Sequence, residues 1–583
     1  MVSRTMRITA SALVASALEV GDSVGNAPGA QPVNKARAQS AASRHRMTGM
    51  PRILAERPGG IAHFGYPHDV AELADWFLTA AERGNPASQV PAWCEGNLAE
   101  PLIHGSTYFD HLVTEVEALR AGDHLFFTDW RGDADQKLRD DGPTVGELFR
   151  AAADRGVVVK GLMWRSYPNV FQFNEEENRH LGEAIKRAGG EVLLDQRGRI
   201  GGSHHQRLVV IRHADAPERD VAFAGGIDLC HSRRDNESHR GDPQAVRMSS
   251  RYGDRPPWHD VQLQVRGPAV GALDTTFRER WTAPASVNSF NPWASLRDKI
   301  EGTNVTPGPL PEQRPDPPHC GPHAVQVLRT YGDALPRYEF AKDGERTIAR
   351  GYTKAVRRAR HLIYLEDQYL WSEEVAKLFV DALAANPQLQ LVAVVPRYFD
   401  LQGGLSRPPT LVGRQLVIDA LRRAGPGRVH VFDVENREGT PVYVHSKICV
   451  VDDTWACVGS ANLNRRSWTH DSELSCAVMD SDGVFARDFR LRLLREHLDR
   501  AADGSEDGGL VDPVTTVSEI VDSALTLDAW HESGRDGPRP PGRLRPHEAE
   551  QVGPLTRLWA EPAYRLIYDP DGRSYVDRLR RRL

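Results

Sequence analysis

The stretch that decides the fold is His445-Ser446-Lys447-Ile448-Cys449-Val450-Val451-Asp452, and Gly459-Ser460-Ala461-Asn462 follows it after a short gap. An imperfect copy lies 240 residues upstream and reads His205-Gln206-Arg207-Leu208-Val209-Val210-Ile211-Arg212, with Gly225-Gly226-Ile227-Asp228 behind it. Each half of the chain therefore carries one histidine and one cation in the same local order. This repetition predicts one site assembled at a pseudo-two-fold interface.

Two further landmarks recur in the same order along the chain. Residues 122–130 resemble residues 360–369, and the histidines within them, His124 and His361, are 237 residues apart. Residues 159–165 are similar to residues 391–397 at an offset of 232. Nearly constant offsets at three places indicate a duplication with different loop lengths, because chance similarity between apolar strands would scatter.

Composition limits the class of protein. The 583 residues are 40% hydrophobic, which is enough for substantial cores, and the net charge of −6 shows no global basic excess typical of nucleic-acid binders. No run approaches the roughly 18 apolar residues of a spanning helix, which argues against an integral membrane protein. The six cysteines are too sparse and irregular for a disulfide scaffold or a zinc site, so we interpret most of them as small buried hydrophobes.

Composition breaks divide the chain. Residues 1–50 predict a disordered leader with a weakly signal-like start, and the seven prolines of residues 303–323 predict a linker, because neither helix nor sheet tolerates that density. The expected units are a first lobe at 51–302, a second lobe at 324–502 and a C-terminal extension at 503–583. Strand-like apolar runs alternate with helix-patterned segments in both lobes, so we expect an α/β fold of two pseudo-symmetric sandwich lobes with the site at their interface.

The second motif combines groups that suit phosphate chemistry. Alternation along a strand would place His445 and Lys447 on the same face, where the imidazole can act as nucleophile or general acid and the lysine can neutralise phosphate oxygens. The Ser460 hydroxyl and the Asn462 amide can donate hydrogen bonds to the same oxygens, and Asp228 holds the position of Asn462 in the first copy. This set needs no metal, and we expect no cofactor.

The spacing H-x-K-x-x-x-x-D, with Gly-Ser-x-Asn behind it and an echo in the other half, resembles the signature of the phospholipase D superfamily. The resemblance covers residues 51–499 and implies a bilobed fold and a ping-pong phosphodiester reaction through a phosphohistidine. It assigns His205 as the nucleophile and His445 as the acid/base. It also implies structural roles for Asp452 and for the glycines of the two turns, Gly225, Gly226 and Gly459.

Related enzymes orient each histidine with a downstream carboxylate. Glu473 opens a strand-like run 28 residues after His445, and Asp260 opens the matching run of the first half. We therefore predict that Glu473 is the partner of His445 and that Asp260 is the partner of His205, each holding the tautomer of its imidazole.

The first motif departs from the family pattern at two positions. Arg207 replaces the lysine but keeps a positive charge in a planar fork suited to phosphate. Arg212 replaces the aspartate, which puts the local loop in doubt more than the chemistry. Asp215 and Asp220, in the longer loop that follows, are candidates to replace the missing carboxylate.

The Gly-Gly-x-Asp turn and the additional histidine His204 resemble the lipid-cleaving branch of the family, which favours a phospholipid over nucleic acid as partner. The leading hypothesis is phospholipase D-type hydrolysis or transphosphatidylation. The alternatives are a cardiolipin-synthase-like phosphatidyltransferase, a nuclease of the same superfamily and a catalytically dead binding protein. The polar segment 230–255 is either a rim that recognises the headgroup or a solvated insertion. We expect a monomer, because both lobes are in one chain, in the cytoplasm or at a membrane surface, with secretion left open by the signal-like start.

Overall fold

The computed structural model describes residues 70–166, 175–199, 201–283, 306–334, 336–400, 406–574 and 577–578. The predicted leader, residues 1–50, lies outside them. Among the described residues, no helix combines the length and the apolar character needed to cross a bilayer. All six cysteines are free, and four of them are buried, as expected for small hydrophobes.

The first half forms a seven-stranded part of a mixed sheet. Its spatial order, starting at the centre of the molecule, is β1 (Cys94–Ile103), β8 (Val261–Arg266), β6 (Val221–Gly225), β5 (Leu208–Arg212), β2 (His124–Asp129), β3 (Val158–Trp164) and β4 (Glu191–Asp195). β2, β3 and β4 are parallel, and β5 runs antiparallel to β2.

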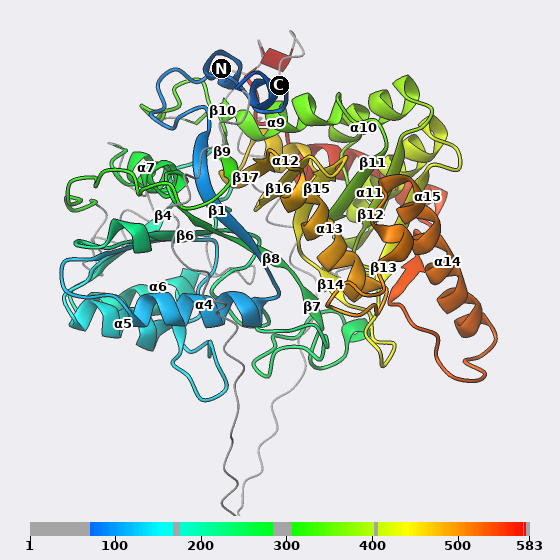
Figure 1. Ribbon diagram of the computed structural model, residues 1–583, viewed down its shortest axis with the longest axis horizontal. Helices are drawn as coiled ribbons and strands as arrows, with labels where there is room; N and C mark the ends of the chain where they lie inside the picture. Colours follow the sequence, from blue (N-terminus) through cyan, green and yellow to red (C-terminus); the bar gives the residue numbers. More distant parts are fainter. Residues whose placement is uncertain are drawn as a thin grey trace, which may run out of the picture.

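The second half repeats this order strand for strand. It runs β9 (His323–Tyr331), β17 (Glu473–Asp480), β16 (Trp455–Gly459), β15 (Lys447–Val451), β11 (Leu362–Asp367), β12 (Gln390–Val394) and β13 (Val429–Val434). The directions match as well, since β11, β12 and β13 are parallel and β15 is antiparallel to β11. β1 pairs antiparallel with β9 and joins the two sets, which lie on either side of these strands in Figure 1. The predicted α/β fold of two pseudo-symmetric lobes is confirmed.

Helices cover both faces of each lobe. In the first half, α4 (Gly105–Glu117), α5 (Val145–Asp154) and α6 (Glu175–Lys186) lie together on one face (Figure 1), and α7 (Ala269–Trp281) covers the other. The alternation of β2 explains these two layers, because Leu125 and Phe127 pack with the first group while Phe126 packs with α7. The second half has α9 (Thr347–Val356), α10 (Glu373–Ala385) and α11 (Arg407–Ala424) on one face and α13 (Val484–His497) on the other.

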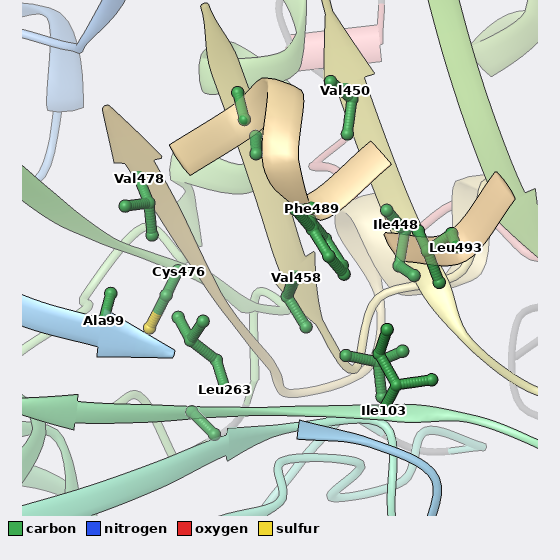
Figure 2. Close-up of a cluster of buried hydrophobic side chains, with 14 of the residues drawn as sticks. Ala99, Ile103, Leu263, Ile448, Val450, Val458, Cys476, Val478, Phe489 and Leu493 are labelled. Carbon is green, nitrogen blue, oxygen red and sulfur yellow. The ribbon is translucent and has the colours of Figure 1, made fainter. Parts of the chain in front are cut away.

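A shared apolar core holds the lobes together. Figure 2 shows Ile103 and Leu263 of the first half beside Val458 and Cys476 of the second, with Phe489 of α13 against them. β17 packs against β6, and β16 against β8, across this core. The ends of these strands are therefore fixed relative to the opposite lobe, which matters for the site below.

Short elements complete the described chain: α2 (Val70–Trp76), α3 (Ala80–Arg83), β7 (Trp258–His259), β10 (Glu345–Arg346), β14 (Tyr443–Val444), α12 (Arg465–Thr469), α14 (Pro513–Glu532), β18 (Leu544–Pro546), α15 (Pro554–Ala563), the π-helix η5 (Tyr564–Tyr568) and the 3₁₀ turns η2 (Pro217–Arg219), η3 (Ser250–Tyr252) and η4 (Gly508–Leu510). Residues 306–322 of the proline-rich segment form neither helix nor strand, and Pro311 and Gly308 accept hydrogen bonds from α7. After residue 503, β18 pairs antiparallel with β13 and extends the second sheet.

Candidate active site

Each motif histidine lies just before a central strand and is anchored to the other lobe. The His205 N–H donates to the Ser472 carbonyl at 2.8 Å, and the His445 N–H donates to the His259 carbonyl at 2.8 Å. β14 also pairs with β7, which aligns Val444 with His259. The predicted continuous strand through His445 and Lys447 is wrong, because the chain breaks out of strand geometry between β14 and β15 to make this contact.

The orienting carboxylates are exchanged between the lobes. Nδ1 of His205 lies 2.9 Å from Oε2 of Glu473, and Nδ1 of His445 lies 2.6 Å from Oδ2 of Asp260. The predicted pairs, Glu473 with His445 and Asp260 with His205, are therefore wrong. The reason is that Glu473 follows Ser472 and Asp260 follows His259, the two residues whose carbonyls hold the opposite motif.

The charges of the two motifs act on one another, as expected for one shared site. Burial, together with the nearby Arg207 and Lys447, holds the pKa of His205 well below its ordinary value, and burial and Lys447 lower the pKa of His445 to about 3. Burial and Arg207 lower the pKa of Lys447 to about 7. Both imidazoles are thus neutral near pH 7 in the free protein.

The two carboxylates differ in their electrostatics. Burial, with Asp471 nearby, raises the pKa of Glu473 well above its usual range. Burial acts in the same direction on Asp260, but the positive charges of His445 and Lys447 outweigh it and lower the pKa. The carboxylate beside His205 therefore takes up a proton more readily than the one beside His445.

Asp228 pairs with two cations in the free protein, and its predicted contact with phosphate stays a prediction. Its Oδ1 accepts from Nε of Arg207 at 2.8 Å and its Oδ2 from Nη2 of Arg233 at 2.9 Å. A fully buried carboxylate that carries two guanidinium groups fixes their position for an anion. The sequence analysis did not single out Arg233, and the signal for it was the charged character of segment 230–255. The Arg233 guanidinium lies 4.0 Å over the ring of Trp258, a cation–π contact that holds it in place.

Ser460 supports a carboxylate in the free protein, and its predicted contact with phosphate stays a prediction. Its hydroxyl donates to Oε2 of Glu473 at 2.5 Å and accepts from the Leu474 N–H at 3.0 Å. Asn462 is buried, and its Oδ1 has no hydrogen-bond partner within the described parts of the chain. Its predicted donation to phosphate stays a prediction.

The glycines of the two turns leave room for side chains of the site. A Cβ on Gly226 would lie 2.2 Å from Oδ1 of Asp260, and one on Gly459 would lie 2.0 Å from Oγ of Ser475. Gly225 ends β6 directly before this turn. Gly226 is the counterpart of Ser460, so only the second lobe has a hydroxyl at this place.

The motif aspartate of the second lobe is structural, and its counterpart is an ion cluster. Asp452 accepts the N–H groups of residues 360–362. Arg212 instead donates from Nε to Asp220 at 2.6 Å and from Nη1 to Asp274 at 3.1 Å, with all three side chains fully buried. Asp220 thus neutralises Arg212, while Asp215 is exposed. Two carboxylates accept backbone N–H groups here: Asp123 accepts from Arg120 and Ala214, and Asp220 accepts from His213 at 2.6 Å.

Comparisons with known proteins place this chain among phospholipase D relatives. A family model described as phospholipase D matches residues 125–375, and one described as cardiolipin synthase, PLD-like domain, matches residues 353–491. Phospholipase D alpha 1 of Cynara cardunculus is 26% identical over 68% of this chain and 63% of its own length. Phospholipase D beta 1 of Arabidopsis thaliana is 25% identical over 68% of this chain and 48% of its own length, so the chain spans less than two thirds of either relative.

Among solved structures, a phosphatidylserine synthase from Haemophilus influenzae aligns with 78% of this chain and 99% of its own, at 12% identity and a TM-score of 0.48. The two family models together span both motifs, from residue 125 to residue 491. The chain belongs to the phospholipase D superfamily.

Proposed function

We propose that the protein is a phospholipase D-type phosphodiesterase that cleaves a phospholipid by hydrolysis or transphosphatidylation through a phosphohistidine, with no metal ion at the reacting phosphate. The observation that carries the proposal is the exchanged pairing of the two motif histidines with two carboxylates. Arg207, Arg233 and Lys447 supply the positive charge that a phosphodiester needs.

In the first step, His205 attacks phosphorus. In its ionised form Glu473 accepts the Nδ1 hydrogen of His205, which leaves the Nε2 lone pair for the attack. The bond from phosphorus to the leaving alcohol breaks, and His445 gives that alcohol its proton. A bound phosphate anion offsets the cations that lower the pKa of His445, so the substrate itself favours the protonated acid.

In the second step, water or an acceptor alcohol attacks the phosphohistidine and gives its proton to Nε2 of His445. The phosphorus–nitrogen bond breaks and His205 is neutral again. The assignment of His205 as the nucleophile follows the family resemblance, and it is supported by exposure, because the side chain of His205 is 15% exposed and that of His445 is 6% exposed.

The phospholipid substrate rests on the names of the relatives and on the Gly-Gly-x-Asp turn. Such a substrate implies peripheral contact with a membrane, and we propose a monomer that is cytoplasmic or at the membrane surface. Phosphatidyl transfer of the cardiolipin-synthase type is the second candidate, favoured by the family model that matches residues 353–491. It uses the same covalent step with a different acceptor alcohol.

The test compares wild type, His205→Ala, His445→Ala and the exposed-site control His361→Ala on labelled phosphatidylcholine and on single-stranded DNA, without added metal and with or without ethanol. We expect wild type and His361→Ala to release choline and to form phosphatidylethanol. An acid-labile, base-stable label should remain bound to wild type and to His361→Ala, and should be absent from His205→Ala. Wild-type rates in both active-site variants, or turnover of DNA alone, would refute the proposal.

A further inference from the structure

Three histidines and a carboxylate converge beside the active site, outside the groups that the reaction uses. His104 precedes α4, His239 lies in segment 230–255, His259 belongs to β7, and Glu496 comes from α13 of the other lobe. The ring centroids of the three histidines are 5.0, 5.4 and 5.6 Å apart, so the rings surround one point. His239 and His259 are fully buried, and His104 is nearly so.

The outer contacts of two rings fix which nitrogen faces inward. Nδ1 of His239 lies 3.1 Å from the Trp258 carbonyl, which can only accept, and Nε2 of His259 lies 2.9 Å from Oε2 of Glu366. The N–H of each neutral ring therefore points outward. The inward atoms, Nε2 of His239 and Nδ1 of His259, carry lone pairs.

These lone pairs face another acceptor. Nε2 of His239 is 2.8 Å and Nδ1 of His259 is 3.5 Å from Oε1 of Glu496, while Nε2 of His104 is 2.7 Å from Oε2. Lone pairs directed at a carboxylate repel it unless a positive charge lies between them. The cluster therefore requires a cation, which is either one or more protons or a metal ion.

We propose that His104, His239, His259 and Glu496 bind one divalent transition-metal ion of the zinc class that bridges the two lobes. The four ligand atoms all lie within 4.8 Å of one another. Three imidazole nitrogens and one carboxylate oxygen suit a four-coordinate ion, whose ligands at roughly 2.0–2.1 Å would stand about 3.3 Å apart. The shortest contacts thus need to open by only about half an ångström.

A carboxylate outside the cluster orients His259, as is usual for metal-binding histidines. Glu366 accepts from His259, from Nε2 of His497 at 2.9 Å, from the Ser446 hydroxyl at 2.6 Å and from the Tyr364 hydroxyl at 2.7 Å. Four donors use its four lone-pair positions, so Glu366 orients His259 and does not bind an ion itself.

Protons alone fit the cluster less well than a metal ion. A single proton on His259 leaves the inward lone pair of His239 against the carboxylate, whereas one metal ion satisfies all four ligands.

The position of the cluster makes its role structural. The His259 carbonyl anchors His445, and the next residue is Asp260, so an ion on His259 steadies the acid/base pair without contacting substrate. A pocket of about 560 Å³ reaches His104 and Glu496 and offers a route from solvent.

The test uses the full chain and does not depend on enzyme activity. After purification with zinc and extensive dialysis, metal analysis should find one equivalent per chain in wild type and in the control His531→Ala, whose histidine pairs with Glu435 elsewhere. His239→Ala and Glu496→Gln should lose it. Removal of the ion with a chelator should lower the Tm of wild type by a few degrees, and zinc should restore it.

Cobalt substitution covers the case in which the variants fail to fold, because tetrahedral Co²⁺ in wild type would show intense visible bands that zinc abolishes. Wild type without a tightly bound equivalent of zinc or cobalt would overturn the proposal in favour of a protonated cluster. Retention of the equivalent by folded His239→Ala and Glu496→Gln would also overturn it.

Discussion

Arg212 stands where the family signature has aspartate, and we predict that restoring the signature with Arg212→Asp disrupts the first lobe. The guanidinium is fully buried between Asp220 and Asp274, which are fully buried as well. The substitution removes the cation that pairs with both carboxylates and adds a third negative charge. Asp274 would keep Arg278 as its partner.

The magnitude follows from the cost of breaking buried ion pairs. Removing one partner of a buried pair costs roughly 3–5 kcal/mol, because the other charge stays desolvated. Arg212 serves two carboxylates, so we expect a loss of at least about 5 kcal/mol, which is near the lower end of the stability of a whole domain. Arg212→Lys keeps the charge but loses the fork, and we expect a smaller loss of about 1–2 kcal/mol.

Urea and thermal unfolding followed by tryptophan fluorescence measure the effect. The matched control is Arg219→Asp, which reverses an exposed charge in the same loop and should change stability by less than about 0.5 kcal/mol. If Arg212→Asp unfolds at the same midpoint as wild type, the reasoning that the cluster replaces the motif aspartate is refuted.

Three further predictions concern the site. Asp260→Asn should slow the cleavage of phospholipid about 10²–10⁴-fold, because Asp260 supports the acid His445. Its rate should recover on a diester with a p-nitrophenol leaving group, which needs no acid, whereas the rate of Glu473→Gln should not. The reverse pattern would support pairing within each lobe. Because the pKa of Lys447 is about 7, its positive charge is lost as the pH rises through this value, so kcat/KM should fall above about pH 7; Lys447→Arg should remove this alkaline limb, and an unchanged pH profile would contradict the assignment. Gly226→Ala places a Cβ 2.2 Å from Oδ1 of Asp260 and should lower kcat by about 10²-fold, while Gly553→Ala, with open space around it, should leave kcat unchanged; equal rates would show that the turn adapts.

Much of the fold could be predicted from the sequence, because a duplication repeats whole runs of residues at a constant offset. The runs at residues 122–130 and 360–369 became β2 and β11, the matching parallel strands of the two lobes. What the offsets could not show is the edge strand β18, since its pairing with β13 follows from tertiary contacts of a segment that has no counterpart in the first half.

The site was predictable in its residue types but not in its connections. His205, His445 and the two carboxylates were found from local spacing, yet spacing along the chain says nothing about which lobe a strand end faces. The pairing of Asp228 with Arg233 was not predicted for a related reason: Arg233 lies five residues later in a loop without periodicity. The histidine cluster was missed because its members come from four separate segments and no two of them share a motif spacing.

The two lobes differ at the carboxylates that orient the two histidines, and the two histidines have different roles in the proposed reaction. In the second lobe Ser460 donates to Glu473, but the same place in the first lobe is Gly226, against which Asp260 packs. Burial and Asp471 raise the pKa of Glu473 although the hydrogen bond from Ser460 acts in the opposite direction, whereas His445 and Lys447 outweigh burial and lower the pKa of Asp260. A histidine that must carry a covalent phosphoryl group and one that must gain and lose a proton need different environments, and exchange of the carboxylates lets each lobe tune the histidine of the other. Neither lobe alone can then form a complete pair, which gives a physical reason for keeping both in one chain.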